Sequence, residues 1–230
     1  MTKFFISIQG GYQGLYIALF REKICIQEVF KNDKRASSEL VPYVQELLQE
    51  HNLSLNDCAF IAVDRGPGAF TSLRVVLATV NGIGLAASKP LIGVNGLQAL
   101  SDQVKASIAD ESKNFVLLLN AYNDDVYYAL ETVGNDREEG CEKIQDLLAR
   151  LKAGYPELSF VFAGNAVQLH AEKIKEALPR AQLLDEFQVA TAEFVGLRAY
   201  QDWLEQKNIT TKVEPLYLKT QYFSLKKPPL

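Results

Sequence analysis

The sequence predicts an α/β fold of two similar lobes, each a mixed sheet flanked by helices. Three observations support this prediction. Short apolar runs typical of strands open each half of the chain, helices then alternate with single strands, and the second half repeats the order of the first. The pattern restarts close to residue 108, so we expect an N-terminal lobe over residues 1–108 and a C-terminal lobe over residues 109–230.

The first half begins with three short strands and then alternates helices with strands. A glycine-rich segment and a charged turn separate the first three apolar runs, a spacing typical of hairpins or of a meander. The segment after them has apolar residues at helical spacing. The expected strands are 3–8, 15–20, 24–30, 59–63 and 91–94, and the expected helices are 37–51, 70–87 and a segment that ends near 109.

The second half starts again with strands. The expected strands are 114–119, 125–132 and 158–163, and the expected helices are 142–152, 167–178 and 192–207. The last of these helices carries its apolar residues on one side. We therefore expect it to close the C-terminal lobe, followed by a short tail.

The composition indicates a folded protein with a large core and excludes several classes of function. Of the 230 residues, 48% are hydrophobic and 23% are charged, and the formal net charge is −4. Because Lys and Arg are not clustered, we do not expect the chain alone to bind a nucleic-acid backbone strongly. Cys25, Cys58 and Cys141 match neither a disulfide framework nor a zinc spacing, and His51 and His170 add no metal cluster. The N-terminal apolar run is broken by Gln and Gly, so we expect no signal peptide and a cytoplasmic protein.

A glycine-rich turn, Arg65-Gly66-Pro67-Gly68, connects a strand to the apolar helix over residues 70–87. Pro67 lacks an N–H group and the glycines admit backbone angles closed to other residues, so the strand cannot continue here. A turn of this kind before a helix often directs N–H groups and the positive end of the helix dipole at an anion. We therefore regard Arg65, Gly66, Pro67 and Gly68 as candidate contacts to a nucleotide or anion, although no lysine of the Walker type follows.

The helix over residues 70–87 has no polar face. Arg74 is its only charge, and polar residues and glycines interrupt it too often for a membrane span of about 20 apolar residues. Ala78, Gly82 and Ala86 lie four residues apart, and such a line of small residues lets another helix come close. The helix is either enclosed by its own lobe or placed between its sheet and a second protein chain, and we favour the second arrangement because outer helices normally have a polar stripe. The residues expected at the core of the partner surface are Phe70, Leu73, Val76, Leu77 and Val80.

Four segments are similar to motifs of one bacterial family. The most specific is residues 65–74, RGPGAFTSLR, which resembles R-G-P-G-S-F-T-G-L-R. Residues 90–97 and 214–219 resemble P-x-x-G-V-S-x-L and E-P-x-Y-L-R, and residues 120–127 match D-A-R-x-x-E-V-Y more weakly. On these motifs the chain is identified as a member of the TsaB (YeaZ) family, in the superfamily of acetate kinase, sugar kinases, Hsp70 and actin. The resemblance implies that both lobes are actin-like (ASKHA, ribonuclease H-like).

The chain departs from the family pattern where related kinases handle metal and phosphate. The first strand of the family ends in I-D-T, whereas Gln9 stands here, and a glutamine cannot supply the negative charge that a Mg²⁺ site needs. The segment 34–37 lacks the family's histidine, and Asn120-Ala121-Tyr122 replaces D-A-R. We therefore expect no catalytic residues and no metal site. The remaining polar candidates, expected in turns and at strand edges, are Asp64, Tyr122, Asp124 and Asp125.

The resemblance implies a non-catalytic scaffold subunit of the complex that makes N6-threonylcarbamoyladenosine at position 37 of ANN-decoding tRNAs. Such a subunit pairs through helices of its N-terminal lobe with the catalytic paralogue TsaD, and the ATPase TsaE joins them. The partner surface would be the helix over 70–87 with the helix over 37–51 beside it. Alone, the chain is expected to form a homodimer, to reach tRNA only through the complex and to bind no membrane. No tightly bound cofactor is expected, and the resemblance admits ATP or ADP at the interface of the complex.

Two alternatives come from other classes of protein. A small nucleotide-dependent kinase or ATPase of the same superfamily would need an acid in the first loop, and Gln9-Gly10-Gly11-Tyr12 offers none. A peptidase, the less favoured alternative, would need a nucleophile–base pair or a metal, and two distant histidines do not supply one. Turnover of ATP by the purified chain would favour the kinase or ATPase.

Overall fold

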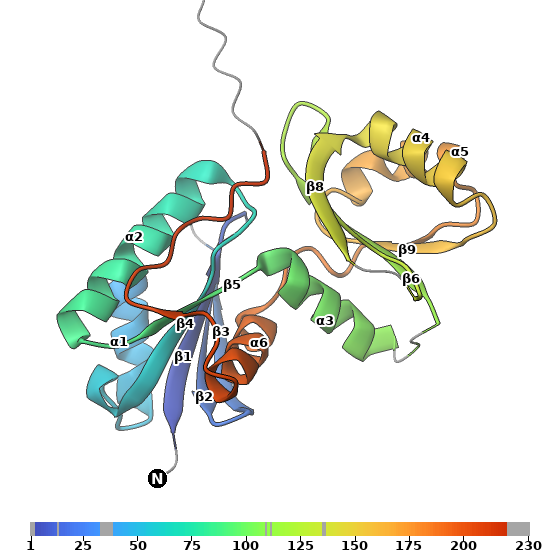
Figure 1. The fold of residues 1–230 in the computed structure, drawn as a ribbon. Coiled ribbons are helices and arrows are strands. Elements are labelled where there is room, and N and C mark those ends of the chain that lie inside the picture. Colours follow the sequence, from blue (N-terminus) through green and yellow to red (C-terminus); the bar gives the residue numbers. More distant parts are fainter. Residues whose placement is uncertain are drawn as a thin grey trace, which may run out of the picture.

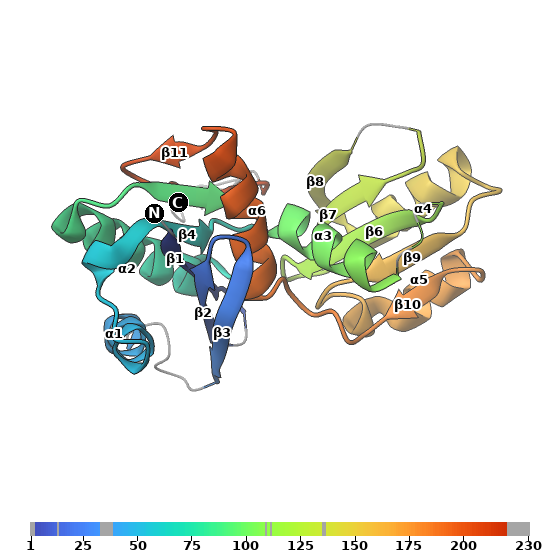
Figure 2. The same ribbon diagram turned by 90° about the horizontal axis from the view of Figure 1, so that it is seen from below.

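The computed structural model describes residues 3–12, 14–32, 39–108, 110, 112–134 and 137–219. It contains two mixed sheets in two lobes that lie side by side, with helices packed against each sheet (Figure 1, Figure 2). This architecture confirms the predicted α/β fold of two similar lobes. The segment 34–37, where the family's histidine is missing, lies outside the described residues.

The first sheet has six strands in the order β11-β5-β4-β1-β2-β3. β1 pairs antiparallel with β2 and parallel with β4, and β4 pairs parallel with β5. The strands are β1 (Phe4–Gly10), β2 (Leu15–Arg21), β3 (Ile24–Lys31), β4 (Cys58–Asp64), β5 (Leu91–Val94) and β11 (Ile209–Thr210).

The second sheet has the order β10-β9-β6-β7-β8, which repeats β5-β4-β1-β2-β3 strand for strand. The strand directions repeat as well, because β6 pairs antiparallel with β7 and parallel with β9. The strands are β6 (Asn114–Asn120), β7 (Asp125–Glu131), β8 (Glu138–Lys143), β9 (Phe160–Ala163) and β10 (Gln182–Leu184).

Helices cover both faces of the first sheet and separate it from the second. Helices α1 and α2 pack on one face of the first sheet and α6 packs on the other, while α3 lies between the lobes and α4 and α5 cover the far side of the second sheet (Figure 1). The helices are α1 (Leu40–Glu50), α2 (Phe70–Ala87), α3 (Gly96–Ile108), α4 (Ile144–Gly154), α5 (Ala171–Ala177) and α6 (Ala192–Leu204), with short 3-10 turns η1 (Leu55–Asp57) and η2 (Gln168–His170).

One hydrophobic cluster joins the two lobes. Phe5 of β1 stacks on Phe20 and on Phe60, with ring centroids 4.6 Å and 4.3 Å away, on the α6 face of the first sheet. The same cluster continues through Leu97 of α3 to Leu117 of β6. The lobes therefore share buried apolar contacts in addition to the chain segments that connect them.

The last helix of the chain packs against the first lobe. The sequence predicts that residues 192–207 close the C-terminal lobe, whereas α6 packs on the first sheet and β11 pairs with β5. Trp203 stacks on Phe60 at 4.8 Å, and a Cβ on Gly196 would lie 2.3 Å from the ring of Phe20, so the glycine permits close approach. The aromatic side chains on this face of the first sheet thus pack against α6, although α6 follows the second lobe in the sequence. The boundary between residues 108 and 109 itself stays a prediction.

Candidate functional site

The glycine turn between β4 and α2 is held by hydrogen bonds within the first lobe. Gly66 has a φ of +99°, and a Cβ there would lie 2.8 Å from the side chain of Leu73, so glycine is strongly favoured. Its N–H donates to Oδ1 of Asp64 (2.7 Å), and its carbonyl accepts the N–H of Gly96 (2.8 Å). The N–H of Gly66 is therefore not free for an anion. Contact between the remainder of the turn and a nucleotide or anion stays a prediction.

Asp64 is a buried acid at the bottom of the cleft between the lobes. Its Oδ2 accepts a hydrogen bond from the side chain of Gln9 (3.4 Å), and the site needs a glycine at position 96, where a Cβ would lie 2.6 Å from Oδ1. Burial raises the pKa of Asp64 to about 6, and the hydrogen bonds from Gly66 and Gln9 oppose that rise. Such an acid could exchange a proton with a ligand only if a ligand could enter the cleft.

The cleft above Asp64 is almost filled by the chain itself. Side chains and backbone from both lobes line it, including Gln9, Tyr12, Leu119 and Val189. The cavity that remains is about 10 Å³, which is close to the smallest volume that holds one water molecule. Small-molecule sites commonly enclose about 300–1,000 Å³. In this conformation the cleft therefore has no room for a nucleotide.

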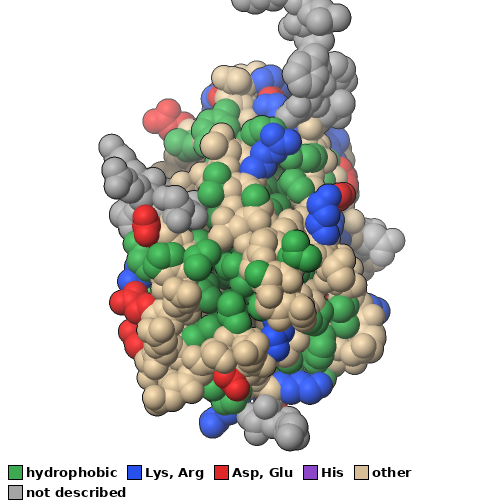
Figure 3. All heavy atoms as spheres, turned by 90° about the vertical axis from the view of Figure 1, so that its left-hand side faces the viewer, with side chains coloured by type: hydrophobic (Ala, Val, Ile, Leu, Met, Phe, Trp, Pro, Cys, Tyr) green, Lys and Arg blue, Asp and Glu red, His purple; other side chains and the backbone are tan. Residues whose placement is uncertain are grey.

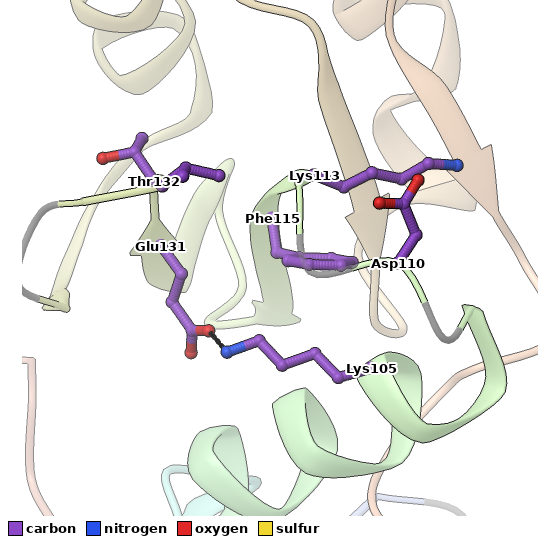
Figure 4. Close-up of a pocket in the computed structure, with 7 residues that line it drawn as sticks. Lys105, Asp110, Lys113, Phe115, Glu131 and Thr132 are labelled. Carbon is purple, nitrogen blue, oxygen red and sulfur yellow. Dashed lines mark ion pairs between the residues drawn. The ribbon is translucent and has the colours of Figure 1, made fainter.

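A larger cavity of about 560 Å³ opens between α3 and the second sheet (Figure 4). Lys105 of α3 forms an ion pair with Glu131 of β7, and Oγ of Ser101 donates to the same carboxylate (2.9 Å). Arg137 pairs with Glu131 as well. Lys105 and Ser101 of α3 therefore link the first lobe to Glu131 of the second sheet, whereas the pair of Arg137 and Glu131 lies within the second lobe.

Tyr122 and Asp124 lie in the turn between β6 and β7, and Asp125 is the first residue of β7. Tyr122, Asp124 and the residue between them have positive φ angles. The carboxylate of Asp125 pairs with Lys143 (2.8 Å) and with Lys219 (2.7 Å). This placement matches the turn and strand-edge positions expected from the sequence.

Four of the five residues expected in the partner surface lie inside the first lobe. Leu73, Val76, Leu77 and Val80 pack between α2 and the first sheet, and their exposed fractions are 3% or less. The structure therefore corrects this prediction: these side chains complete the core of their own lobe. The sequence shows apolar residues all round the helix and does not show which side meets the sheet. Phe70 is exposed at the start of α2, and its contact with a partner stays a prediction.

The outer face of α2 is apolar, and the described residues of the chain leave it exposed. It consists of Val75, Ala78, Gly82, Leu85 and Ala86, which recur at spacings of three and four and so lie on one side of the helix. Leu85 is 81% exposed and Val75 is 39% exposed. Figure 3 views this side of the molecule and shows hydrophobic side chains gathered over it. The small residues Ala78, Gly82 and Ala86 are all exposed, so their spacing in the sequence indicated this face.

A groove runs along each side of the outer face of α2. The first, of about 500 Å³, lies between α1 and α2 and includes Val41, Leu55 and Ile83 in its walls. The second, of about 510 Å³, lies between α2 and the segment 212–217. The outer face is therefore flanked by two concave surfaces that could receive side chains of another protein.

The segment 211–219, here called the C-terminal strap, fastens to α2 and to the glycine turn. The side chain of Asn81 accepts the N–H of Val213 (2.8 Å) and donates to the carbonyl of the same residue (3.0 Å). The N–H of Leu216 donates to the carbonyl of Arg65 (2.8 Å). Two of the family motifs, far apart in the sequence, therefore meet beside the N-terminal half of α2.

In the described part of the chain, no group of three or more His, Cys, Asp or Glu residues is placed so that it could hold a metal ion. One helix of the described residues, α2, is long and apolar enough to cross a membrane by length and composition. Because one side of α2 packs on the first sheet, the same composition also fits a helix of a folded lobe.

Comparisons with known proteins agree on one family. The family model of TsaD, tRNA N6-adenosine threonylcarbamoyltransferase, matches residues 27–221. The tRNA threonylcarbamoyladenosine biosynthesis protein TsaB of Buchnera aphidicola (Acyrthosiphon pisum) is 21% identical over 161 residues, which cover 66% of this chain and 72% of that protein. TsaB of Escherichia coli is 35% identical over 96 residues, 42% of each chain.

A solved structure supports the same fold. YeaZ from Pseudomonas aeruginosa superposes with a TM-score of 0.75 over 94% of this chain and 100% of that one, at 20% sequence identity. Both lobes therefore have the actin-like fold that the motifs imply. Together with the match to the TsaD model, these similarities show that the chain belongs to the TsaD family and, within it, to the TsaB (YeaZ) proteins of threonylcarbamoyladenosine biosynthesis.

Proposed function

We propose that the chain is the non-catalytic scaffold subunit of the complex that makes N6-threonylcarbamoyladenosine at position 37 of ANN-decoding tRNAs. In this proposal it pairs with the catalytic paralogue TsaD, the ATPase TsaE joins them, and tRNA is reached only through the complex. The observation that carries the proposal is the uncovered apolar outer face of α2.

The outer face of α2 has the properties of a surface that a second chain covers. A helix in an outer layer normally presents polar side chains to water, whereas Val75 and Leu85 are exposed here. Ala78 and Gly82 between them would let a partner helix approach closely, and the flanking grooves could receive its side chains. Cores of permanent interfaces are apolar and poor in charge in the same way.

The closed cleft favours the function of a scaffold rather than that of a nucleotide-dependent enzyme. A kinase or ATPase of this fold that bound its nucleotide between the lobes would need hundreds of Å³, and about 10 Å³ remains. Gln9 stands where the family has an acid, so the first loop supplies no carboxylate for Mg²⁺. We therefore place any ATP or ADP at the interface of the complex, and we place the protein in the cytoplasm with the other subunits.

The oligomeric state tests the proposal directly. Light scattering would give the native mass of the chain alone and after mixing with the TsaD of the same organism. We expect a homodimer alone, because the same outer face can pair two copies, and a one-to-one heterodimer with TsaD. A chain that stays monomeric in both samples would contradict the proposal.

A pair of variants would assign the interaction to α2. Ala78→Asp places a charge at the centre of the outer face, and an unpaired charge buried in an interface should weaken pairing by about 100-fold or more. Leu169→Asp is the matched control, because Leu169 is exposed in η2 of the second lobe. Circular dichroism would show that both variants are folded. Equal binding of TsaD by both variants would exclude the outer face of α2 as the interface.

A further inference from the structure

Tyr12 lies in the loop between β1 and β2, and its side chain enters the space between the lobes. The ring packs against the hydrophobic cluster that joins the lobes. Its hydroxyl donates a hydrogen bond to the backbone carbonyl of Asn120, at the end of β6 (2.8 Å). Tyr12 thus belongs to the first lobe and bonds to the second.

Glycines shape the loop and the surface that the ring covers. Gly14 has a φ of +121°, and a Cβ there would lie 2.5 Å from the carbonyl oxygen of Lys31, so the loop needs glycine at this position. A Cβ added on Gly68 would make an ordinary van der Waals contact with the ring of Tyr12, at 3.8 Å, so the ring faces the glycine turn. The ring therefore sits over the turn that begins α2.

The ring leaves almost no free space, and the polar groups that line the same cavity bond to one another. About 10 Å³ remains in the cavity that Tyr12 and Asp64 both line. The carboxylate of Asp64 accepts hydrogen bonds from Gln9 and from the backbone of Gly66. Burial raises the pKa of Tyr12 above its ordinary range, so the hydroxyl stays protonated and remains a donor at neutral pH.

We propose that Tyr12 is a built-in occupant of the cleft between the lobes: its ring fills the space that a small ligand would take, and its hydroxyl fastens the first lobe to β6. A second donor acts on the next residue, because Nζ of Lys219 in the C-terminal strap donates to the carbonyl of Ala121 (2.9 Å). Two consecutive carbonyls at the end of β6 are thus held by groups from outside the second sheet. This inference does not rest on the proposed partner.

Removal of the ring should create a site for the missing group. Apolar cavities of about 150 Å³ bind benzene in engineered proteins, so the Tyr12→Ala variant should bind p-cresol, which is the tyrosine side chain as a free molecule. Calorimetry should show saturable binding of p-cresol by Tyr12→Ala, and the ligand should raise the melting temperature of this variant alone. The wild type and Tyr122→Ala, which removes an exposed tyrosine, are the matched controls and should not respond.

Tyr12→Phe separates the two roles of the side chain. This variant keeps the ring, so it should not bind p-cresol. Because it loses the hydroxyl, hydrogen exchange of the amides at residues 119–122 should become several-fold faster than in the wild type. If Tyr12→Ala is folded and binds no p-cresol, or if the wild type binds it equally well, the ring is not an occupant. If Tyr12→Ala does not fold, an unchanged exchange rate in Tyr12→Phe overturns the fastening role, and a faster one supports it.

Discussion

The two faces of α2 consist of similar residues but differ in what covers them. On the inner face Val76 and Val80 are completely buried against the first sheet, and on the outer face Val75 and Leu85 are exposed. Hydropathy therefore does not distinguish the faces, and only the position of the sheet does. A continuous apolar helix face, unlike a single exposed apolar residue, is typical of a surface that becomes buried. On the inner face the lobe itself supplies that burial, and on the outer face we propose that a second chain does.

The largest expected effect is a difference in stability between two variants at neighbouring valines of α2. Val76→Asp buries a charge with no partner on the inner face, and we expect it to lower the free energy of unfolding by about 4 kcal/mol or more. Val75→Asp places the same charge in water on the outer face and should change stability by less than about 1 kcal/mol. Urea denaturation of both variants measures the difference.

The same pair of variants tests whether the two faces of α2 differ in this way. Val75→Asp should remain folded and lose its binding to TsaD, whereas a folded Val76→Asp variant with near wild-type stability would show that the inner face is not the core of the lobe. Two equally destabilised variants would show that the outer face is covered within the chain itself.

The next effect concerns the one buried acid among the described residues, Asp64, beside the turn that begins α2. Its pKa is raised to about 6 by burial, above the ordinary value near 3.8. The stability linked to this group is therefore fully present below about pH 3.8 and is lost as the pH rises through 6. Asp64→Asn removes the titration and keeps an acceptor for the N–H of Gly66.

Denaturation curves at several pH values test this linkage. Between about pH 4.5 and about pH 7.5, the wild type should lose about 2 kcal/mol of stability relative to Asp64→Asn. Comparison of the two proteins cancels the other titrating groups, which they share. Parallel pH profiles would show that Asp64 is hydrated in the folded protein and that the cleft above it is open.

Much of the fold follows from local patterns in the sequence. The apolar run and the flanking turn predict α2 with the bounds Phe70–Ala87 that the structure shows. The prediction omits β8, because Glu138–Lys143 is a polar strand at the edge of its sheet and lacks an apolar face. It assigns α6 to the wrong neighbours, because the fit between Gly196 and Phe20 depends on a contact between distant segments. Long-range complementarity of this kind has no local signal.

The candidate site was predictable only in part. The sequence indicates that Gln9 stands where the family has an acid, and it predicts Asp64 only as a turn or strand-edge residue. The structure places the two side chains in hydrogen-bond contact. For Tyr12 the sequence predicts only a place in a loop without an acid. A large aromatic residue among Gly10, Gly11 and Gly14 was the available signal, since a flexible loop can turn such a side chain inward. That the ring reaches the second lobe depends on how the lobes face each other.

The smallest expected effect comes from two glycines on opposite faces of α2. Gly82 is open, with nothing within 4 Å of an added Cβ, so Gly82→Ala should stabilise the chain by about 1 kcal/mol through helix propensity. At Gly84 the added Cβ would lie 2.7 Å from Leu91, so overpacking of about 1–3 kcal/mol should cancel or exceed the same gain. Melting temperatures of the two variants measure the difference, and equal stabilisation would show that the inner face is loosely packed. Gly82→Ala should also weaken binding to TsaD, because its methyl group enters the line of small residues where we propose that a partner helix approaches.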